Sequence, residues 1–195
     1  CALGENVFGS DFSLDIQIFV SPGGYILGEE TALLEALEGR RGEPRNKPPY
    51  PGVEGLHGKP TLINNVETFA HVPRSLTTGE TSLKFFSVSG DVEHPAVFEV
   101  PLGTTLRQLV ERAGGIKDGG ELLAFLPGGA STGFLSAEHA DISMTFDALQ
   151  NVGSALGSGA VIVVSQGRNL IELAQNLTTF FRNESCGKCV PCRIG

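Results

Sequence analysis

The chain has 195 residues, of which 41% are hydrophobic and 18% charged, and its formal net charge is −8 at pH 7. This length and composition are typical of a globular protein with a substantial core. The acidic balance argues against a nucleic-acid partner, because nucleic-acid binders usually present a basic face. No apolar run approaches the roughly 20 residues of a membrane-spanning helix, so direct insertion into a membrane is not expected.

A strand, a glycine-rich loop and a helix are predicted in succession near the start of the chain. Residues 15–20 alternate polar and apolar side chains, as in a half-buried strand. The loop 21–30 leads into a helix over 31–38 that ends at Gly39. This arrangement can present backbone N–H groups to a phosphorylated ligand, although the spacing is not that of a dinucleotide fingerprint or a Walker loop. A flavin or nucleotide site and an ordinary tight turn both stay open.

The next segment, residues 39–60, is predicted to be an extended surface loop, because its five prolines disfavour both helix and inner strand. Its basic residues face either an acidic ligand or water, and composition alone favours water. A helix is expected to begin near Val66, with Asn65 as its N-cap. The amides of Asn64 and Asn65 both donate and accept hydrogen bonds, which suits the edge of a heteroaromatic ring. Helix capping is the equally weighted alternative.

From residue 83 the pattern changes to strands. Two strands, over 85–92 and 96–101, are joined by a turn and followed by a helix over 105–113. Further strand candidates are 121–126 and 160–164. A hairpin followed by a helix and more strands resembles a small β-grasp unit. A final amphipathic helix, residues 168–183, leads to a loop rich in cysteine.

That loop carries the most specific signal, with Cys186, Cys189 and Cys192 at a strict spacing of three. Cys-x2-Cys-x2-Cys is the pattern by which one loop binds three irons of a [4Fe–4S] cluster. Structural zinc sites more often use two separated pairs of ligands, so zinc, a disulfide or inert thiols are the lesser alternatives. The only other cysteine, Cys1, is expected to be structural, and the fourth cluster ligand is expected outside the chain. Reduced thiols favour a cytosolic location.

Four motifs in this order resemble those of the flavin-bearing, NADH-oxidising subunits of complex I, the 51 kDa-type or F subunits of NADH–quinone oxidoreductase. The resemblance covers essentially the whole chain. It is carried by Tyr25 with Gly28-Glu29-Glu30-Thr31-Ala32-Leu33, Glu38-Gly39-Arg40-Arg41, Asn64-Asn65-Val66-Glu67-Thr68 and Glu184-Ser185-Cys186-Gly187-Lys188-Cys189.

The resemblance implies an oxidoreductase: a flavoprotein with NADH dehydrogenase activity that carries FMN and a [4Fe–4S] cluster and takes part in electron transport toward quinone. Hydride would pass from NADH to FMN, and single electrons then to the cluster. No residue is implied as a catalytic acid or base. The residues implied to line the flavin and nicotinamide pocket are Tyr25, Gly28, Glu29, Glu30, Asn64, Asn65 and Thr68, and the cluster ligands are Cys186, Cys189 and Cys192.

The implied fold is α+β: the C-terminal part of an FMN-binding α/β domain (residues 1–80), a β-grasp, soluble ligand-binding domain (81–166) and the start of a helical iron–sulfur domain (167–195). The implied partners are other subunits of the respiratory complex, notably a [2Fe–2S] thioredoxin-like one. The implied location is cytoplasmic, on the inner face of the cell membrane, or the matrix side in mitochondria. Both ends are expected to be cut from a longer polypeptide, so that the piece alone would be inactive.

Three alternative functions stay open from the sequence. Within the same family, the chain resembles the diaphorase subunits of NAD-dependent formate dehydrogenases and of NAD-reducing or bifurcating hydrogenases. From a different class, a β-grasp unit can act as a non-enzymatic ligand or docking module. A zinc scaffold is the third alternative. Tolerance of NADPH and the identity of the quinone cannot be read from these residues.

Overall fold

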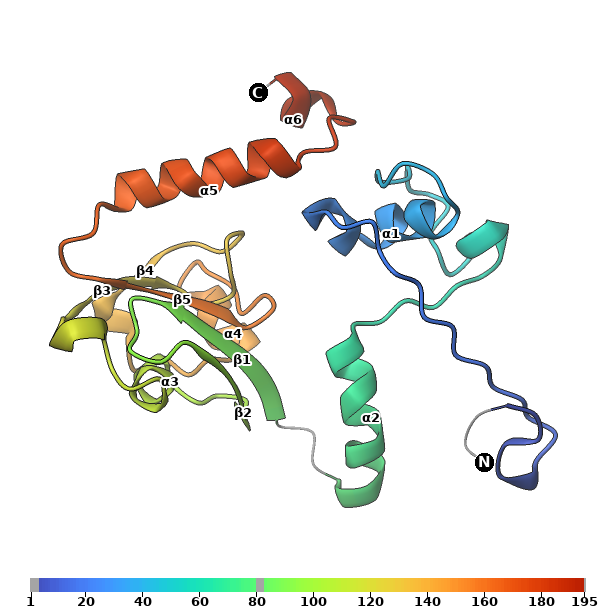
Figure 1. Ribbon diagram of the computed structural model, residues 1–195, viewed down its shortest axis with the longest axis horizontal. Helices are drawn as coiled ribbons and strands as arrows, with labels where there is room; N and C mark the ends of the chain where they lie inside the picture. Colours follow the sequence, from blue (N-terminus) through green and yellow to red (C-terminus); the bar gives the residue numbers. More distant parts are fainter. Residues whose placement is uncertain (1–3, 80–82, 195) are drawn as a thin grey trace. The chain divides into compact units, whose positions relative to one another are not determined.

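The computed structural model describes residues 4–79 and 83–194 (Figure 1). The chain forms two compact units, one of Cys1–Ile63 with Thr179–Gly195 and the other of Asn64–Thr178. The first unit therefore brings the cysteine loop together with the N-terminal third of the chain. The division of the chain into three domains stays a prediction, and the expected role of Cys1 lies outside the described residues.

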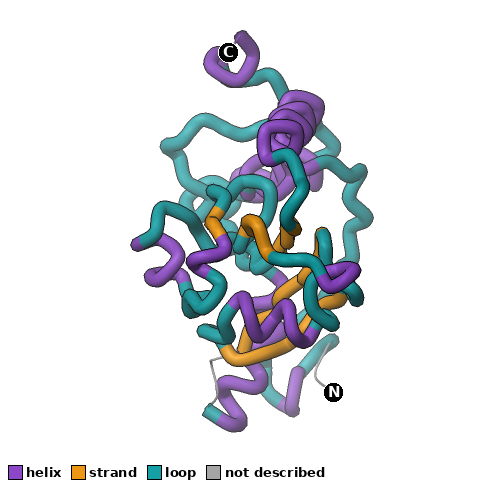
Figure 2. Tube along the Cα trace, turned by 90° about the vertical axis from the view of Figure 1, so that its left-hand side faces the viewer, coloured by secondary structure: helices purple, strands orange, loops and turns teal. Residues whose placement is uncertain are grey.

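The second unit contains a mixed five-stranded sheet in the order β2-β1-β5-β3-β4. Strands β1 (Leu83–Gly90) and β2 (Ala96–Pro101) form the predicted antiparallel hairpin. Strand β5 (Ala160–Ser165) pairs parallel with β1 and antiparallel with β3 (Leu122–Leu126), and β4 (Leu135–Ser136) adds an edge. In Figure 2 the strands gather in one part of the molecule. The predicted β-grasp architecture and the α+β class are confirmed.

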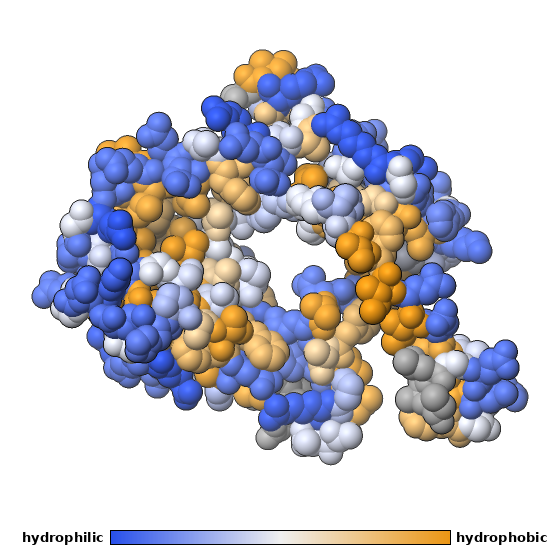
Figure 3. All heavy atoms as spheres, in the orientation of Figure 1, coloured by the Kyte–Doolittle hydropathy of each residue, from blue (hydrophilic) through white to orange (hydrophobic). Residues whose placement is uncertain are grey.

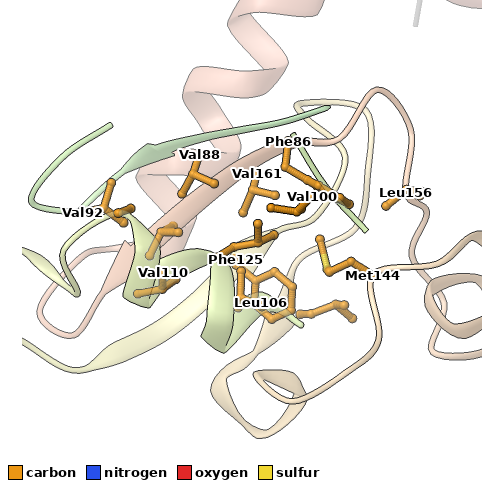
Figure 4. Packing of buried hydrophobic residues seen from close by; sticks show 14 of the residues in the cluster. Phe86, Val88, Val92, Val100, Leu106, Val110, Phe125, Met144, Leu156 and Val161 are labelled. Atoms are coloured by element: carbon orange, nitrogen blue, oxygen red, sulfur yellow. The ribbon is translucent and has the colours of Figure 1, made fainter. Parts of the chain in front are cut away.

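One helix, α3 (Leu106–Arg112), supplies much of the apolar core of this sheet. Thr105 and Gln108 form a reciprocal capping box at its start, which satisfies two otherwise unpaired backbone N–H groups. The spacing of Leu106, Leu109 and Val110 then places three apolar side chains on one face. The core cluster comprises Phe86, Val88, Val92, Val100, Leu106, Leu109, Val110, Ala113, Phe125, Leu135, Met144, Leu149, Leu156, Val161 and Val163 (Figure 4).

Close backbone contact within the sheet requires a glycine at one position. Gly90 ends β1 with a φ of +89°, and a Cβ built there would lie 2.2 Å from the carbonyl oxygen of Val163. Directly after it, the buried carboxylate of Asp91 accepts hydrogen bonds from Ser165 and Arg168. These bonds hold the pKa of Asp91 well below its usual range, with the Arg168 hydrogen bond as the largest cause, against the opposing effect of burial. They fix the chain where β5 ends.

Five further helices complete the described regular structure, besides short 3-10 turns. They are α1 (Glu30–Leu37), α2 (Val66–Thr78), α4 (Phe146–Asn151), α5 (Leu170–Glu184) and α6 (Val190–Ile194), of which the short α4 belongs to the β-grasp unit. Helices α1, α2, α3 and α5 match the sequence prediction within two residues at their starts, whereas α4 and α6 were not predicted. Among the described residues, no helix is long and apolar enough to cross a membrane.

The predicted strand over residues 15–20 is wrong. These residues have no regular structure, and the alternation buries neither face: Ile18 is 91% exposed and Val20 86% exposed. Apolar side chains reach the surface in several places (Figure 3). A strand is stabilised by pairing with a neighbour and by packing of one face, and no strand in the described part of the chain pairs with this segment.

Candidate functional site

The glycine-rich segment forms a short 3-10 turn, Tyr25–Gly28, that leads directly into α1. Gly24 has a φ of +113°, which few other residues adopt, and this allows the chain to turn before Tyr25. Gly28 is exposed, and a Cβ built on it would meet no atom within 4 Å. The missing side chain therefore leaves open backbone surface at the turn, as required for a flat ligand to approach it.

Glu29 serves as the N-cap of α1. Its Oε2 atom accepts hydrogen bonds from the backbone N–H groups of Thr31 (2.9 Å) and Ala32 (3.0 Å) and from the Thr31 hydroxyl. Partial burial raises the pKa of Glu29, but the hydrogen bonds from Thr31, Lys47 and Ala32 outweigh it, so the net pKa is below the usual value. A carboxylate at this position also interacts favourably with the helix dipole. Helix capping is thus one demonstrated role of Glu29.

Lys47 lies in the proline-rich loop, residues 39–60, and forms ion pairs with both Glu29 and Glu30. Its ammonium group lies 3.1 Å from Glu29 Oε1 and 2.6 Å from Glu30 Oε1. The side chain of Glu30 is 41% exposed and that of Glu29 is 32% exposed. Glu30 is therefore the more accessible of the two carboxylates beside the open surface at Gly28.

Arg40 and Arg45 of the same loop also pair with carboxylates, whereas composition alone had favoured water as their surroundings. Arg45 and Arg40 both bind Glu35 and Glu38, which project from α1 and its end. The hydrogen bond from Arg40, against the opposing effect of burial and with help from Arg45, holds the pKa of Glu35 at about 2. These ion pairs fasten residues 40–45 to α1 and thereby define the surface on which the cysteine loop lies.

The cysteine loop, residues 185–189, contacts residues 41–44, and the end of α5 before it contacts the glycine-rich turn. Glu184 Oε2 accepts a hydrogen bond of 2.8 Å from the backbone N–H of Tyr25. Arg41 donates one of 2.8 Å to the carbonyl oxygen of Cys186. Lys188 donates to the carbonyl oxygen of Pro44 and lies 3.4 Å from the Glu43 carboxylate. The segment with the thiols therefore lies against the segment with the glycine-rich turn.

Aromatic contacts reinforce this proximity at Tyr25. Its ring packs edge-on against Phe180 and Phe181, with ring centroids 5.2 and 5.9 Å apart. Both phenylalanines belong to the last turns of α5, immediately before the cysteine loop. Tyr25 itself remains 51% exposed, so one part of the residue is used in packing while another remains accessible to a ligand.

The three cysteines implied as ligands are free thiols, of which Cys189 and Cys192 are exposed and Cys186 is half-buried. The Cys192 sulfur lies 2.9 Å from the Ser185 hydroxyl, which brings it back toward the residue next to Cys186. No group of three potential ligands is gathered around one point within residues 4–79 and 83–194. The donor set nevertheless fits an iron–sulfur cluster chemically, since all three side chains are thiols on one short accessible segment.

The asparagine pair and Thr68 lie in the second unit, at the start of α2, and all three are exposed. Asn65 occupies the N-cap position, as predicted, but its side chain makes no capping hydrogen bond. The structure therefore brings together Tyr25, Gly28, Glu29, Glu30 and the cysteine loop in one unit, and places Asn64, Asn65 and Thr68 in the other.

The sequence interpretation gave no role to Arg41, Lys188 or Glu184, although all three lie inside its motifs. Their long-range contacts could not be read from local spacing. The available signal was their position: Lys188 lies between two of the thiols, and Arg41 follows the helix that the glycine-rich turn begins.

Comparison with known families defines the class of protein. Residues 2–74 match the Nuo51 FMN-binding domain, residues 85–135 match the SLBB domain, and residues 172–195 match the NADH-ubiquinone oxidoreductase-F iron-sulfur binding region. The chain thus combines an FMN-binding region, a β-grasp domain and a 4Fe–4S-binding region in that order.

Individual relatives show which members of this class the chain is similar to. The chain is 43% identical to the F-type subunit of NADH-quinone oxidoreductase in Escherichia coli (strain K12), over 99% of the chain and 46% of that protein. It is 45% identical to the corresponding subunit of Mycobacterium tuberculosis (strain H37Rv), with the same coverage. These matches confirm the resemblance of the whole chain to the flavin-bearing F-type subunits, of which it spans about half the length.

Solved structures give a consistent match. A chain of the NAD+-reducing [NiFe]-hydrogenase in the H2-reduced state superposes with a TM-score of 0.81 at 34% identity, covering 93% of this chain and 33% of that one. The air-oxidized state of that enzyme gives a TM-score of 0.78. This chain therefore shares its fold with a chain of an NAD+-reducing hydrogenase.

Proposed function

We propose that the full-length protein is an NADH dehydrogenase subunit of complex I, an NADH:quinone oxidoreductase that oxidises NADH and delivers electrons toward quinone. The observation that supports this most strongly is that one compact unit holds the glycine-rich turn and the cysteine loop: Glu184, directly before the loop, binds Tyr25 of the turn, and Arg41 binds Cys186 within the loop. When bound, FMN accepts hydride from NADH and the cluster carries single electrons onward. The similarity to F-type subunits over 99% of the chain supports the same function.

Each proposed ligand-binding residue has a distinct task. The open surface at Gly28 admits a flat ring against the backbone, with the exposed face of Tyr25 beside it. Glu30, and Glu29 where its oxygens remain accessible, accept hydrogen bonds from NADH. Asn64, Asn65 and Thr68 bind ring or phosphate groups of FMN through their amides and hydroxyl. Cys186, Cys189 and Cys192 supply three thiolates to the cluster.

The proposed assembly follows from the family. The protein works with other subunits of a respiratory complex, notably a [2Fe–2S] thioredoxin-like subunit. It lies peripherally on the inner, cytoplasmic face of the cell membrane, or on the matrix side in a mitochondrion.

A second candidate is the diaphorase subunit of an NAD-reducing hydrogenase or of a related formate dehydrogenase. The superposition with the NAD+-reducing [NiFe]-hydrogenase supports it. Sequence flanking the chain discriminates between the two, because the diaphorase relatives commonly carry additional ferredoxin- or thioredoxin-like domains.

A direct experiment tests the proposed activity. The purified full-length protein is expected to be yellow-brown, to contain one FMN, and to oxidise NADH with ferricyanide as the acceptor. A protein that stays colourless when FMN is added, and oxidises no NADH, would instead favour a non-enzymatic binding module.

Removing the Asn65 amide or the Thr68 hydroxyl is expected to weaken FMN binding while leaving the protein folded. Each lost hydrogen bond costs about 0.5–1.5 kcal/mol, so Asn65→Ala and Thr68→Ala should each raise the FMN dissociation constant several-fold, and the double variant more. Since Asn65 makes no capping bond, its replacement should not melt α2. Flavin fluorescence titration measures the affinity.

The matched control is Thr77→Ala, which removes a hydroxyl from the last turn of the same helix, where it bonds to backbone carbonyl oxygens. This variant should bind FMN normally. If Asn65→Ala and Thr68→Ala lower thermal stability without changing flavin affinity, the assignment of these residues to the flavin site is wrong.

A further inference from the structure

The cysteine loop has little regular backbone structure to orient it. Residues 185–189 lie between the end of α5 at Glu184 and the start of α6 at Val190. Gly187 within it has a φ of +70°, the left-handed conformation that glycine adopts at low cost. Side-chain contacts to the rest of the unit therefore determine which way the loop faces, with Cys186 and Cys189 in it and Cys192 in the helix that follows.

Two cationic side chains make those contacts, one from each of the two segments that meet. Arg41 reaches from the proline-rich loop to the carbonyl oxygen of Cys186, one of the three thiol residues. Lys188 reaches from the cysteine loop to the carbonyl oxygen of Pro44 and to the Glu43 carboxylate. Charged donors form stronger hydrogen bonds than neutral ones. Together, Arg41 and Lys188 fasten the cysteine loop to residues 41–44 at two points.

Residues 41–44 are themselves held firmly. Arg40 and Arg45, which flank them, bind Glu35 and Glu38 of the α1 segment. The backbone N–H of Arg45 also donates to the Thr31 hydroxyl, 2.9 Å away. Thr31 also bonds to the Glu29 cap. A continuous set of contacts thus runs from the glycine-rich turn through residues 41–44 to the cysteine loop.

We propose that Lys188 and Arg41 are positioning residues that hold the cysteine loop in the arrangement needed for cluster binding. This rests on the proposed assignment of the cluster to Cys186, Cys189 and Cys192. Neither cation supplies a ligand atom. By restraining the loop they reduce the conformational entropy that is lost when three thiolates bind one cluster, and so they slow the release of the cluster.

The test uses the full-length protein purified anaerobically with its cofactors, exposed to an iron chelator, with cluster loss followed by absorbance near 420 nm. Lys188→Met is expected to lose its cluster about fivefold faster than the wild type, the effect of roughly one charged hydrogen bond at a partly exposed site. Lys188→Arg retains a donor for Pro44 and a charge for Glu43, and should restore most of the resistance.

Two further variants separate the contacts. Glu43→Gln removes the ion pair but keeps the bond to the Pro44 carbonyl, so its effect should be smaller than that of Lys188→Met. Arg41→Met should behave like Lys188→Met, and the double variant should lose its cluster faster than either. Lys117→Met removes the same charge from an exposed position in the β-grasp unit and should match the wild type. FMN content should be equal in all variants.

The outcomes distinguish this inference from the proposed function. Cluster loss at the wild-type rate in both Lys188→Met and Arg41→Met overturns the positioning role, as does failure of Lys188→Arg to restore the resistance. A wild-type protein that contains no iron and sulfide overturns the cluster assignment itself, and this inference with it. Electron paramagnetic resonance of the reduced cluster, before the chelator is added, verifies that each variant starts with an intact cluster.

Discussion

Replacing Cys189 with serine is expected to abolish the iron–sulfur cluster proposed for the full-length protein. One of the three thiolates that this segment supplies is lost. A serine hydroxyl is a far poorer ligand for iron, because it is not ionised near neutral pH and is a harder donor than a thiolate. Iron and acid-labile sulfide, measured after anaerobic reconstitution, should fall from about four of each per protein to near zero.

The structure indicates that this substitution removes the thiolate without disturbing the fold. Cys189 is exposed and immediately precedes α6, so its side chain supports no core packing. The β-grasp unit, whose core is built from other residues, should unfold at an unchanged temperature, and FMN should remain bound. Retention of the full cluster signal in Cys189→Ser would refute the ligand assignment. Zinc in place of iron in the wild type would point to a scaffold protein instead.

The two adjacent carboxylates at the start of α1 are expected to respond differently to replacement by glutamine. Glu30→Gln should lower kcat/KM for NADH tenfold or more, because a hydrogen bond to a charged group contributes about 1.5–3 kcal/mol. Its thermal stability should stay near that of the wild type, since the Glu30 side chain is 41% exposed and pairs only with Lys47 among the ion pairs described. Steady-state NADH oxidation with an artificial acceptor, measured beside thermal unfolding, separates the two effects.

Glu29 provides the matched comparison. It caps α1 through two backbone N–H groups and pairs with Lys47, so Glu29→Ala should lower stability by about 1 kcal/mol, as is typical of a lost N-cap. Glu29→Gln keeps an oxygen that can accept these bonds and should destabilise less. Unchanged kinetics in both Glu30→Gln and Glu29→Gln would leave the pair with a role at the helix start only.

The β-grasp unit was predictable because its local signals agree with its tertiary structure. The hairpin of β1 and β2 and the helix α3 have strong periodic patterns, and the Thr105–Gln108 capping box marks the helix start. The helices that were missed, α4 and α6, have six and five residues, and the missed edge strand β4 has two. Both helices span fewer than two turns, which is too short for a helical repeat of apolar residues to be recognised in the sequence.

The candidate site was only partly predictable, because motifs identify residues but do not pair them. The glycine-rich turn and the cysteine spacing named the two segments of the site. Contacts such as Glu184 with Tyr25 join residues 159 positions apart, and no local pattern encodes them. Composition also misled: the basic residues Arg40, Arg45 and Lys47 were expected to face water, yet carboxylates 2 to 18 positions away pair with them.

Residues 15–20 show that a local pattern can also predict an element that does not form. Their alternation is genuine, but alternation predicts a strand only where a partner strand and a packing face are present. In the described part of the chain, residues 15–20 lack both.

The most direct test of the account is an anaerobic titration of the purified full-length protein with NADH, followed by visible absorbance and by electron paramagnetic resonance. We expect the flavin absorbance near 450 nm to bleach, and the low-temperature signal of a reduced [4Fe–4S] cluster to appear in the wild type but not in Cys189→Ser. Flavin bleaching with no cluster signal in the wild type, or no bleaching in a protein loaded with FMN, would contradict the account.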